Sequence, residues 1–142
     1  QKEKQMQHLE SKIQIACVDW FHYQYPQLYY HFFAVPNGGK RTKSLVKTKF
    51  GYKTTSIEGG IMKAEGAKSG ISDLVLQVPN ETYAFLNIEM KSPTGRQSEN
   101  QKKVQQSIDA LKFGKYIICR SFDEFKKEIE DYLQSTKFGI VK

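Results

Sequence analysis

The stretch DLVLQVPNETYAFLNIEMK (73–91) decides the fold. Two largely apolar runs, DLVLQV (73–78) and YAFLNIEM (83–90), flank a Pro-Asn-Glu-Thr segment whose residue types are typical of turns. The pattern predicts two antiparallel strands joined as a hairpin. Because side chains alternate along a strand, one face of the second strand is apolar and the other is mixed. The apolar face holds Leu86, Ile88 and Met90, and the opposite face holds Phe85, Asn87, Glu89 and Lys91.

The register of this hairpin decides whether its acidic residues meet. Asp73 lies directly across from Glu89 only if Val78 pairs with Ala84, which an ordinary odd-length loop allows. A shift of one residue would send the two acids to opposite faces of the sheet. In the favourable register both carboxylates and the Lys91 ammonium converge, and such a cluster suits an oxygen-preferring divalent cation. The alternative is a surface salt bridge between Glu89 and Lys91, worth about 0–1 kcal/mol.

Downstream of the hairpin, the sequence predicts a strand–helix–strand unit. Ser98 and Gln101 have the spacing of a capping box at the start of a helix, and Gly114 has the position of a C-terminal stop. The apolar face of this helix consists of Val104, Ile108 and Leu111. YIICR (116–120) predicts a buried strand, so the unit implies a right-handed parallel crossover.

Upstream of the hairpin, the sequence predicts a helix, a strand and a loop. Apolar residues recur every three or four positions over residues 6–25, which indicates an amphipathic helix that Pro26 ends. HFFAV (31–35) predicts a short strand. Residues 40–56 are rich in Lys, Thr and Ser without a period, so we expect a mobile loop, and residues 57–68 predict a short helix.

A last helix is predicted after the crossover. Ser121 and Glu124 repeat the capping-box spacing, and apolar residues recur at helical intervals through Leu133. This order of elements predicts an α/β protein with a mixed β-sheet flanked by helices. The chain of 142 residues fits a single domain, residues 1–142.

Composition excludes several classes of protein. Hydrophobic residues make up 39% and aromatic residues 13% of the chain, which is too many for a disordered protein. The mean hydropathy is −0.59, and no apolar stretch approaches the ~18 residues of a spanning helix. The N-terminal segment has no apolar signal core. Cys17 and Cys119 form neither a disulfide framework nor a CxxC motif, so we expect two buried free thiols in a reducing compartment.

Positive charge is concentrated in one region. The net charge is +7, and residues 37–70 hold eight basic and two acidic residues, or +6 of that total. The basic residues are Lys40, Arg41, Lys43, Lys47, Lys49, Lys53, Lys63 and Lys68. Such a segment favours a polyanionic partner, although a solvated surface loop explains the charge equally well.

Two further polar residues lie on apolar helix faces. Glu10 falls on the same stripe as Met6 and Ile13, and a carboxylate that faces a core is costly unless it is paired or bound to a cation. For Glu10 alone, an edge glutamate that reaches solvent is the simpler interpretation. Gln101 shares a helix face with Val104, although the capping box already explains a glutamine there.

These polar residues together resemble a known pattern. Asp73, followed by Glu89-x-Lys91 on the next strand and preceded by Glu10 on a helix, is similar to the PD-(D/E)xK nuclease core, with Ser72 in the place of the proline. The motif alone is short and matches often by chance. The resemblance implies a restriction-endonuclease-like core.

Three longer blocks make the resemblance more specific. AVPNGGKR (34–41), IMKAEGAKSGISDLVL (61–76) and LNIEMKSPTGRQSENQKK (86–103) resemble, in this order, the virus-type replication-repair nuclease (VRR-Nuc) domain. The resemblance covers about residues 8–133. Small stand-alone members of that family, often from bacteriophages, resemble Holliday-junction resolvases that act as homodimers, so the resemblance implies a cytoplasmic DNA-repair enzyme of a bacterium or of a phage-infected cell.

The resemblance also implies roles for particular residues. The metal ligands would be the carboxylates of Glu10, Asp73 and Glu89 and the backbone carbonyl of Met90. The catalytic residues would be Lys91, Glu89, Asp73 and Gln101. Asn37, Gly38, Gly39 and Arg41 match the loop beside the active site in this family. Together with the clustered basic residues, they are the candidates for DNA binding: Asn37, Gly38, Gly39, Lys40, Arg41, Lys43, Lys47, Lys49, Lys53, Lys63 and Lys68.

The residue types fit phosphodiester hydrolysis on chemical grounds. Divalent cations lower the pKa of a nucleophilic water and offset charge on phosphoryl oxygens. Carboxylate ligands suit Mg²⁺ or Mn²⁺, whereas His8, His22 and His31 lack the spacing of zinc ligands. We therefore expect Mg²⁺ or Mn²⁺ and no organic cofactor. The basic segment would lie along the DNA backbone and give affinity without reading sequence.

Three functions remain open at this point. The first is a metal-dependent endonuclease for branched DNA, either a homodimeric junction resolvase or an enzyme that cuts flaps or nicks. The second is a nucleic-acid-binding module without catalysis, which needs the basic segment but not the carboxylates. The third is a salt-bridged domain that binds a protein, which explains neither the clustered charge nor the three matching blocks.

Overall fold

The chain folds into two compact units. The computed structural model describes residues 1–36, 44–55 and 57–136. The first unit comprises Gln1–Val35 and Gly70–Lys142, and the second comprises Pro36–Ser69. A four-stranded sheet with helices on both faces builds the first unit, and a β-hairpin and a short helix build the second.

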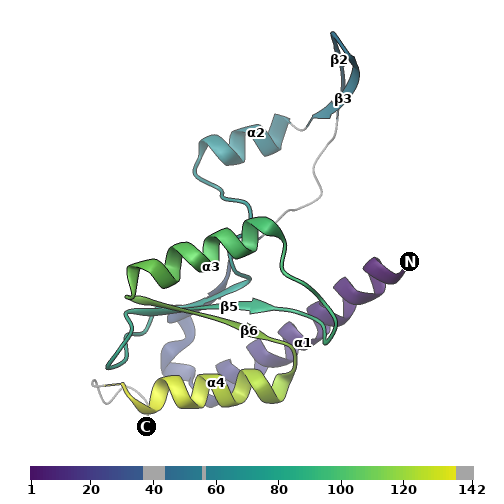
Figure 1. The fold of residues 1–142 in the computed structure, drawn as a ribbon. Helices are drawn as coiled ribbons and strands as arrows, with labels where there is room; N and C mark the ends of the chain where they lie inside the picture. Colours follow the sequence, from purple (N-terminus) through teal and green to yellow (C-terminus); the bar gives the residue numbers. More distant parts are fainter. Residues whose placement is uncertain (37–43, 56, 137–142) are drawn as a thin grey trace. The chain divides into compact units, whose positions relative to one another are not determined.

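The sheet of the first unit is mixed, as predicted. Its strands lie in the order β1-β4-β5-β6 (Figure 1). β1 pairs antiparallel with β4, β4 pairs antiparallel with β5, and β5 pairs parallel with β6 through the intervening helix α3. The four strands are β1 (Phe32–Ala34), β4 (Leu74–Leu76), β5 (Phe85–Met90) and β6 (Gly114–Cys119).

The hairpin β4–β5 has the register that brings the acids together. Leu74 pairs with Ile88 and Leu76 with Leu86, so Asp73, just before β4, lies across from Glu89. The two strands are shorter than predicted, because the connection between them is held by side-chain hydrogen bonds rather than by strand pairing. The Asn80 side chain there accepts hydrogen bonds from two backbone N–H groups and donates a third to α4.

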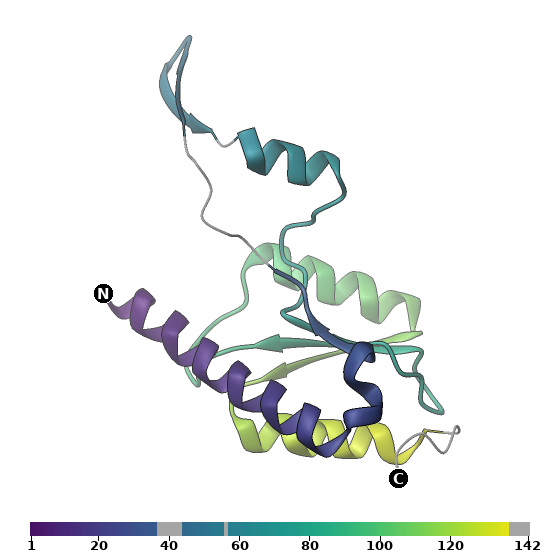
Figure 2. The ribbon, with the colours of Figure 1, turned by 180° about the vertical axis from the view of Figure 1, so that it is seen from behind.

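Helices cover the two faces of the sheet unequally. α1 (Lys2–Gln24) and α4 (Phe122–Gln134) lie on one face, and α3 (Glu99–Leu111) lies on the other (Figures 1 and 2). The hydrophobic core fills the space beneath α1 and α4. It includes Cys17, Phe21, Leu74, Leu76, Leu86, Ile88, Met90, Phe125 and Ile129. No helix in the described parts of the chain has both the length and the apolar character to cross a membrane.

The predicted helix faces are confirmed in part. α4 buries the apolar residues expected of it, whereas α3 buries none, and Leu111 is 64% exposed. In α1 the stripe shifts toward its C-terminal half, where Cys17 and Phe21 are buried, while Leu9 lies at the surface. A 3-10 helix, η1 (Pro26–His31), separates α1 from β1.

Two local predictions at helix ends are wrong. Gly114 does not stop α3, because Lys112 in the left-handed conformation ends it, and Gly114 is the first residue of β6. A Cβ at Gly114 would lie 2.4 Å from the Phe85 ring, which explains the glycine. The second capping box is half formed, since the Glu124 side chain accepts from the Arg120 N–H rather than from that of Ser121.

The second unit contradicts the prediction of a mobile loop at 40–56 wherever it is described. β2 (Ser44–Thr48) and β3 (Gly51–Thr55) form an antiparallel hairpin, in which Gly51 adopts a positive φ of 125°. β-branched residues and this glycine are signals for a hairpin that the high lysine content masked. The short helix α2 (Ile57–Ala64) is confirmed.

Candidate active site

Two carboxylates meet where β4 begins and β5 ends. Asp73 Oδ2 accepts a hydrogen bond of 2.8 Å from the Met90 N–H, which fixes the Asp73 carboxylate beside the end of β5. Glu89 extends from the α3-facing side of β5 and is only 1% exposed. The strand register therefore places two acids at one buried position.

The electrostatics of the pair are those of crowded, desolvated acids. Burial, followed by the proximity of Asp73, raises the pKa of Glu89 to about 8. Burial also raises the pKa of Asp73, against the opposing effect of the Met90 hydrogen bond. Burial and mutual repulsion therefore oppose the ionisation of both acids when no cation is bound.

One oxygen of Glu89 is held by two side chains. Gln101 Nε2 donates to Glu89 Oε1 at 2.6 Å, and Lys91 Nζ lies 3.5 Å from the same oxygen. The Gln101 side chain has a second role in the cap of α3, because its Oε1 accepts a hydrogen bond from the Ser98 N–H, while the backbone N–H of Gln101 donates to Ser98 Oγ. A single glutamine thus caps α3 and orients Glu89.

The other oxygen of Glu89, Oε2, is buried and has no hydrogen-bond partner among the described residues. The buried Tyr116 hydroxyl also lacks a hydrogen-bond partner among them. Burial, followed by the proximity of Glu89, raises the pKa of Tyr116 to about 12. The sequence analysis missed Tyr116 as a site residue, although the parallel pairing of Tyr116 with Asn87 places it on the same sheet face.

Glu10 reaches the edge of this site from α1. Its Oε1 accepts a hydrogen bond of 3.0 Å from the Ser92 N–H, just after the Lys91 position. The turn there is also tied to β6, because Arg120 Nη1 donates to the carbonyls of Ser92 and Gly95. The role of Glu10 as a metal ligand stays a prediction.

The donor set fits a hard divalent cation. Across the described residues, no three His, Cys, Asp or Glu side chains lie together as a metal site, so the site consists of the Asp73–Glu89 pair and what surrounds it. Magnesium is commonly held by one or two carboxylates, with water and substrate phosphate completing its shell. The backbone carbonyl of Met90 is directed toward β4, because the Met90 N–H bonds Asp73 on that side, so it could contribute a further oxygen.

Those basic residues expected to bind DNA that the structure describes belong to the second unit. Lys47 and Lys49 are exposed on the β2–β3 hairpin, and Lys63 and Lys68 are exposed in and after α2. The backbone of Lys53 lies in β3. The remaining candidates, Asn37, Gly38, Gly39, Lys40, Arg41 and Lys43, lie outside the described residues.

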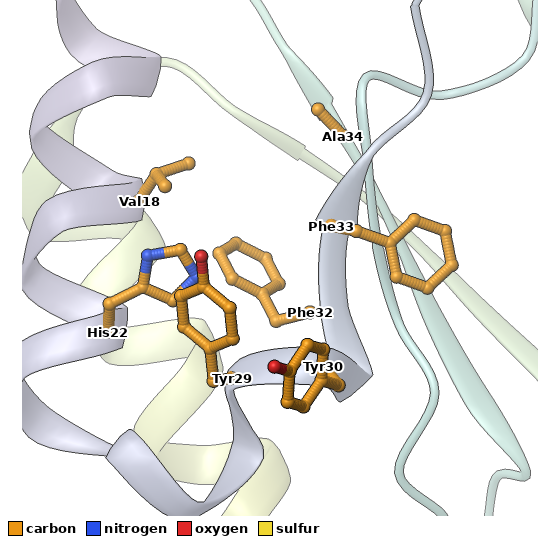
Figure 3. A pocket seen from close by; sticks show the side chains of 7 residues that line it. All are labelled: Val18, His22, Tyr29, Tyr30, Phe32, Phe33 and Ala34. Atoms are coloured by element: carbon orange, nitrogen blue, oxygen red, sulfur yellow. The ribbon is translucent and has the colours of Figure 1, made fainter.

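An aromatic cavity lies at the edge of the sheet formed by β1. It has a volume of about 390 Å³, and α1, η1 and β1 contribute its walls (Figure 3). The His22 and Tyr29 rings lie 4.6 Å apart there, and the lining holds no carboxylate, lysine or arginine.

An antiparallel hairpin that carries Asp73 and Glu89-x-Lys91, followed by a parallel crossover, is the core of the PD-(D/E)xK class. Within that class, the sequence matches the VRR-NUC domain family over residues 9–122, and the chain belongs to this family. A solved structure described as a VRR_NUC domain protein has the same fold, with a TM-score of 0.70 and 18% sequence identity over 93% of each chain. Curated proteins give no match. The chain is accordingly a nuclease-type domain whose substrate is DNA.

Proposed function

We propose that the protein is a divalent-cation-dependent endonuclease that hydrolyses phosphodiester bonds in branched DNA. The observation that carries this proposal is the buried Asp73–Glu89 pair with an unpartnered Glu89 oxygen. Placing two acids in one desolvated position is costly unless they act on a ligand, and a cation is the ligand that relieves their repulsion.

The side chains have distinct tasks in this reaction. Asp73, Glu89 and the Met90 carbonyl would hold Mg²⁺ or Mn²⁺, with Glu10 close by, and the cation would activate water and stabilise charge on the phosphate. Gln101 fixes the Glu89 carboxylate through its 2.6 Å hydrogen bond. Lys91, 88% buried at its side chain, keeps a positive charge beside the reacting phosphate.

A cleavage assay tests this function. Labelled four-way junction, 5′-flap, nicked duplex and plain duplex are incubated with Mg²⁺, Mn²⁺ or EDTA. We expect cation-dependent cleavage of the junction that Asp73→Asn and Lys91→Met abolish. Glu81→Ala is the matched control, because Glu81 is an exposed acid in the β4–β5 connection and its backbone alone is bonded.

Each pattern of products separates the candidate functions. Symmetric cleavage of the junction identifies a resolvase. Cleavage of flaps or nicks alone supports a nuclease and contradicts a junction resolvase. Salt-sensitive binding of every substrate without cleavage, in any of the cation conditions, contradicts the enzyme and leaves a binding module.

The resolvase acts as a homodimer, since a symmetric junction needs two incisions. The supporting feature is the outer edge of β1, which pairs only with β4 among the described strands. His31 and Val35 bond to the strand-β4 side, so Phe32 and Ala34 direct their N–H and C=O groups away from it. Beside that edge, Tyr30 is 86% exposed at the aromatic cavity.

Sedimentation velocity tests the dimer. Tyr30→Glu should shift the protein from dimer to monomer and convert paired incisions into single nicks. Tyr23→Glu is the control, because Tyr23 has the same 86% exposure but lies on α1 outside the cavity lining. A wild-type protein that sediments as a monomer at micromolar concentration contradicts the homodimer.

A further inference from the structure

The tip of the β2–β3 hairpin has a fixed shape. Thr48 pairs with Gly51, so Lys49 and Phe50 form a two-residue loop. The Thr48 hydroxyl donates to the Gly51 carbonyl at 2.9 Å and accepts from the Phe50 N–H at 3.3 Å. With Gly51 at a φ of 125°, these bonds hold the loop in one conformation before any ligand binds.

This tip combines aromatic rings with positive charge. Phe50 is 96% exposed, the highest value among the exposed large apolar residues, and Tyr52 is 70% exposed. The exposed Lys47 pairs across the strands with Tyr52, and Lys49 precedes Phe50 in the loop. A phenylalanine at a hairpin tip contributes nothing to the packing of the hairpin, so its ring is available to a partner.

We propose that Phe50 stacks on a nucleobase at the branch point of the DNA, while Lys47 and Lys49 contact the adjacent phosphates. The inference rests on the proposed function, because it takes branched DNA as the substrate. Every base pair inside a duplex is already stacked on both sides, whereas the last pair at a branch offers a free face. Aromatic side chains recognise such faces without regard to sequence, and the lysines match the charge of the backbone.

This interaction supplies structure selectivity that the carboxylate site lacks. The carboxylates and cation act on a phosphate, which is the same chemical group in plain and branched DNA. An aromatic ring at a hairpin tip distinguishes branched from plain DNA, because it can stack only where the face of a base is not already covered by a neighbouring base pair. The proposed stacking therefore accounts for a preference for branched over plain duplex without a contact to any base edge.

Fluorescence of 2-aminopurine placed at the centre of a four-way junction tests the proposal in EDTA. We expect the full-length protein to change this emission and to bind the junction more tightly than plain duplex. Phe50→Ala should remove the emission change and weaken junction binding by about 5- to 100-fold, with duplex binding unaltered. Phe50→Tyr should restore both. Phe113→Ala is the matched control, since Phe113 is 69% exposed and lies in the first unit.

The salt dependence separates stacking from charge. Lys49→Gln should lower the slope of log affinity against log salt by about 0.9, whereas Phe50→Ala should lower affinity at an unchanged slope. If Phe50→Ala keeps wild-type junction affinity and emission, the stacking proposal is wrong. It is equally wrong if Phe50→Ala dissociates a dimer in sedimentation, because the ring would then pack on a second copy.

The outcomes also distinguish this inference from the proposed function. Cleavage of junctions by wild type and Phe50→Ala at equal rates overturns the stacking and leaves the nuclease intact. A wild-type protein that never cleaves, but loses its junction preference with Phe50→Ala, overturns the enzyme and supports the stacking. Absence of DNA binding by the wild type overturns both.

Discussion

The two faces of β5 bury side chains for opposite purposes. Beneath α1 and α4, its even-numbered residues are at most 2% exposed and apolar. Beneath α3, Glu89 is as deeply buried but ionisable, and it is surrounded by Asp73, Lys91 and Gln101. Burial stabilises the protein on the first face and opposes ionisation on the second. Along this single strand, the even-numbered residues therefore contribute to stability, and Glu89 on the opposite face belongs to the candidate active site.

Glu89→Gln gives the largest expected effect, with opposite signs for activity and stability. Cleavage should fall by about 10²–10³-fold, because an oxygen ligand and its charge are lost. The pKa of Glu89 is raised from 4.5 to about 8, so in EDTA the unfolded chain ionises at a lower pH than the native one. Wild-type stability should therefore fall as the pH rises from about 4.5 to about 8 and stay level above.

Thermal melts across this pH range check the second half of that prediction. Glu89→Gln should lack the decline and should melt at a higher temperature than wild type at pH 8 in EDTA. Adding Mg²⁺ should raise the melting temperature of the wild type more than that of the variant. A variant less stable than wild type at pH 8 would show that Glu89 contributes to stability as well, against the division of the two faces.

Gln101 gives an intermediate effect, and two variants separate its roles. Ser98→Ala removes the side-chain oxygen that caps α3 but leaves Gln101 Nε2 as a donor to Glu89, so it should cost about 0.5–2 kcal/mol in unfolding free energy with little change in cleavage. Gln101→Ala removes the donor to Glu89, so it should also lower cleavage by about 10–100-fold. Equal cleavage rates for the two variants would contradict a role of Gln101 in orienting Glu89.

Ile88→Val gives a smaller effect, confined to stability. Ile88 is fully buried beneath α1 and α4, and removal of one methylene group there should cost about 0.5–1.5 kcal/mol. Denaturant unfolding measures the loss, and single-turnover cleavage at 25 °C should match the wild type. A change in the cleavage rate of the folded variant would mean that the apolar face also sets the geometry of the acids.

The smallest expected effect is that the two cysteines do not react with an alkylating reagent in the native protein. Burial raises the pKa of both Cys17 and Cys119 to about 12, so native thiols should resist iodoacetamide at pH 8. Mass spectrometry should find unmodified native protein and two alkylated cysteines after denaturation. Rapid native labelling would indicate local opening of the core around α1 and β6.

The sequence predicts most of the sheet, because strong constraints act there. Alternation along 83–91 and the requirement that Asp73 meet Glu89 define the strands and their register, and the structure has that register. The Gln101 contact with Glu89 depends on how α3 lies over the sheet, and a capping motif is a complete local explanation for the same residue. Tyr116 was missed because its role appears only once β6 is aligned beside β5.

The second unit shows the limit of reasoning from periodicity. Residues 47–52 are all exposed, so they show no alternation of buried and exposed side chains, and the turn is held instead by hydrogen bonds of Thr48 and by the positive φ of Gly51. Phe50 was likewise overlooked, because Phe50 and Tyr52 lie in a lysine-rich stretch without the spacing of a helix or strand face. The proposed role of Phe50 depends on its exposed position in the loop of the hairpin, which only the structure shows.

The backbone bond between the Val35 N–H and the Asp73 carbonyl has a consequence for protein engineering. This bond joins the two points where the second unit, Pro36–Ser69, is inserted between the neighbouring strands β1 and β4 of one sheet. Excursions that start and finish at adjacent points can be exchanged with little effect on the host. Residues 36–69 should therefore tolerate grafting, shortening or replacement as a unit, while the four-stranded sheet keeps its structure.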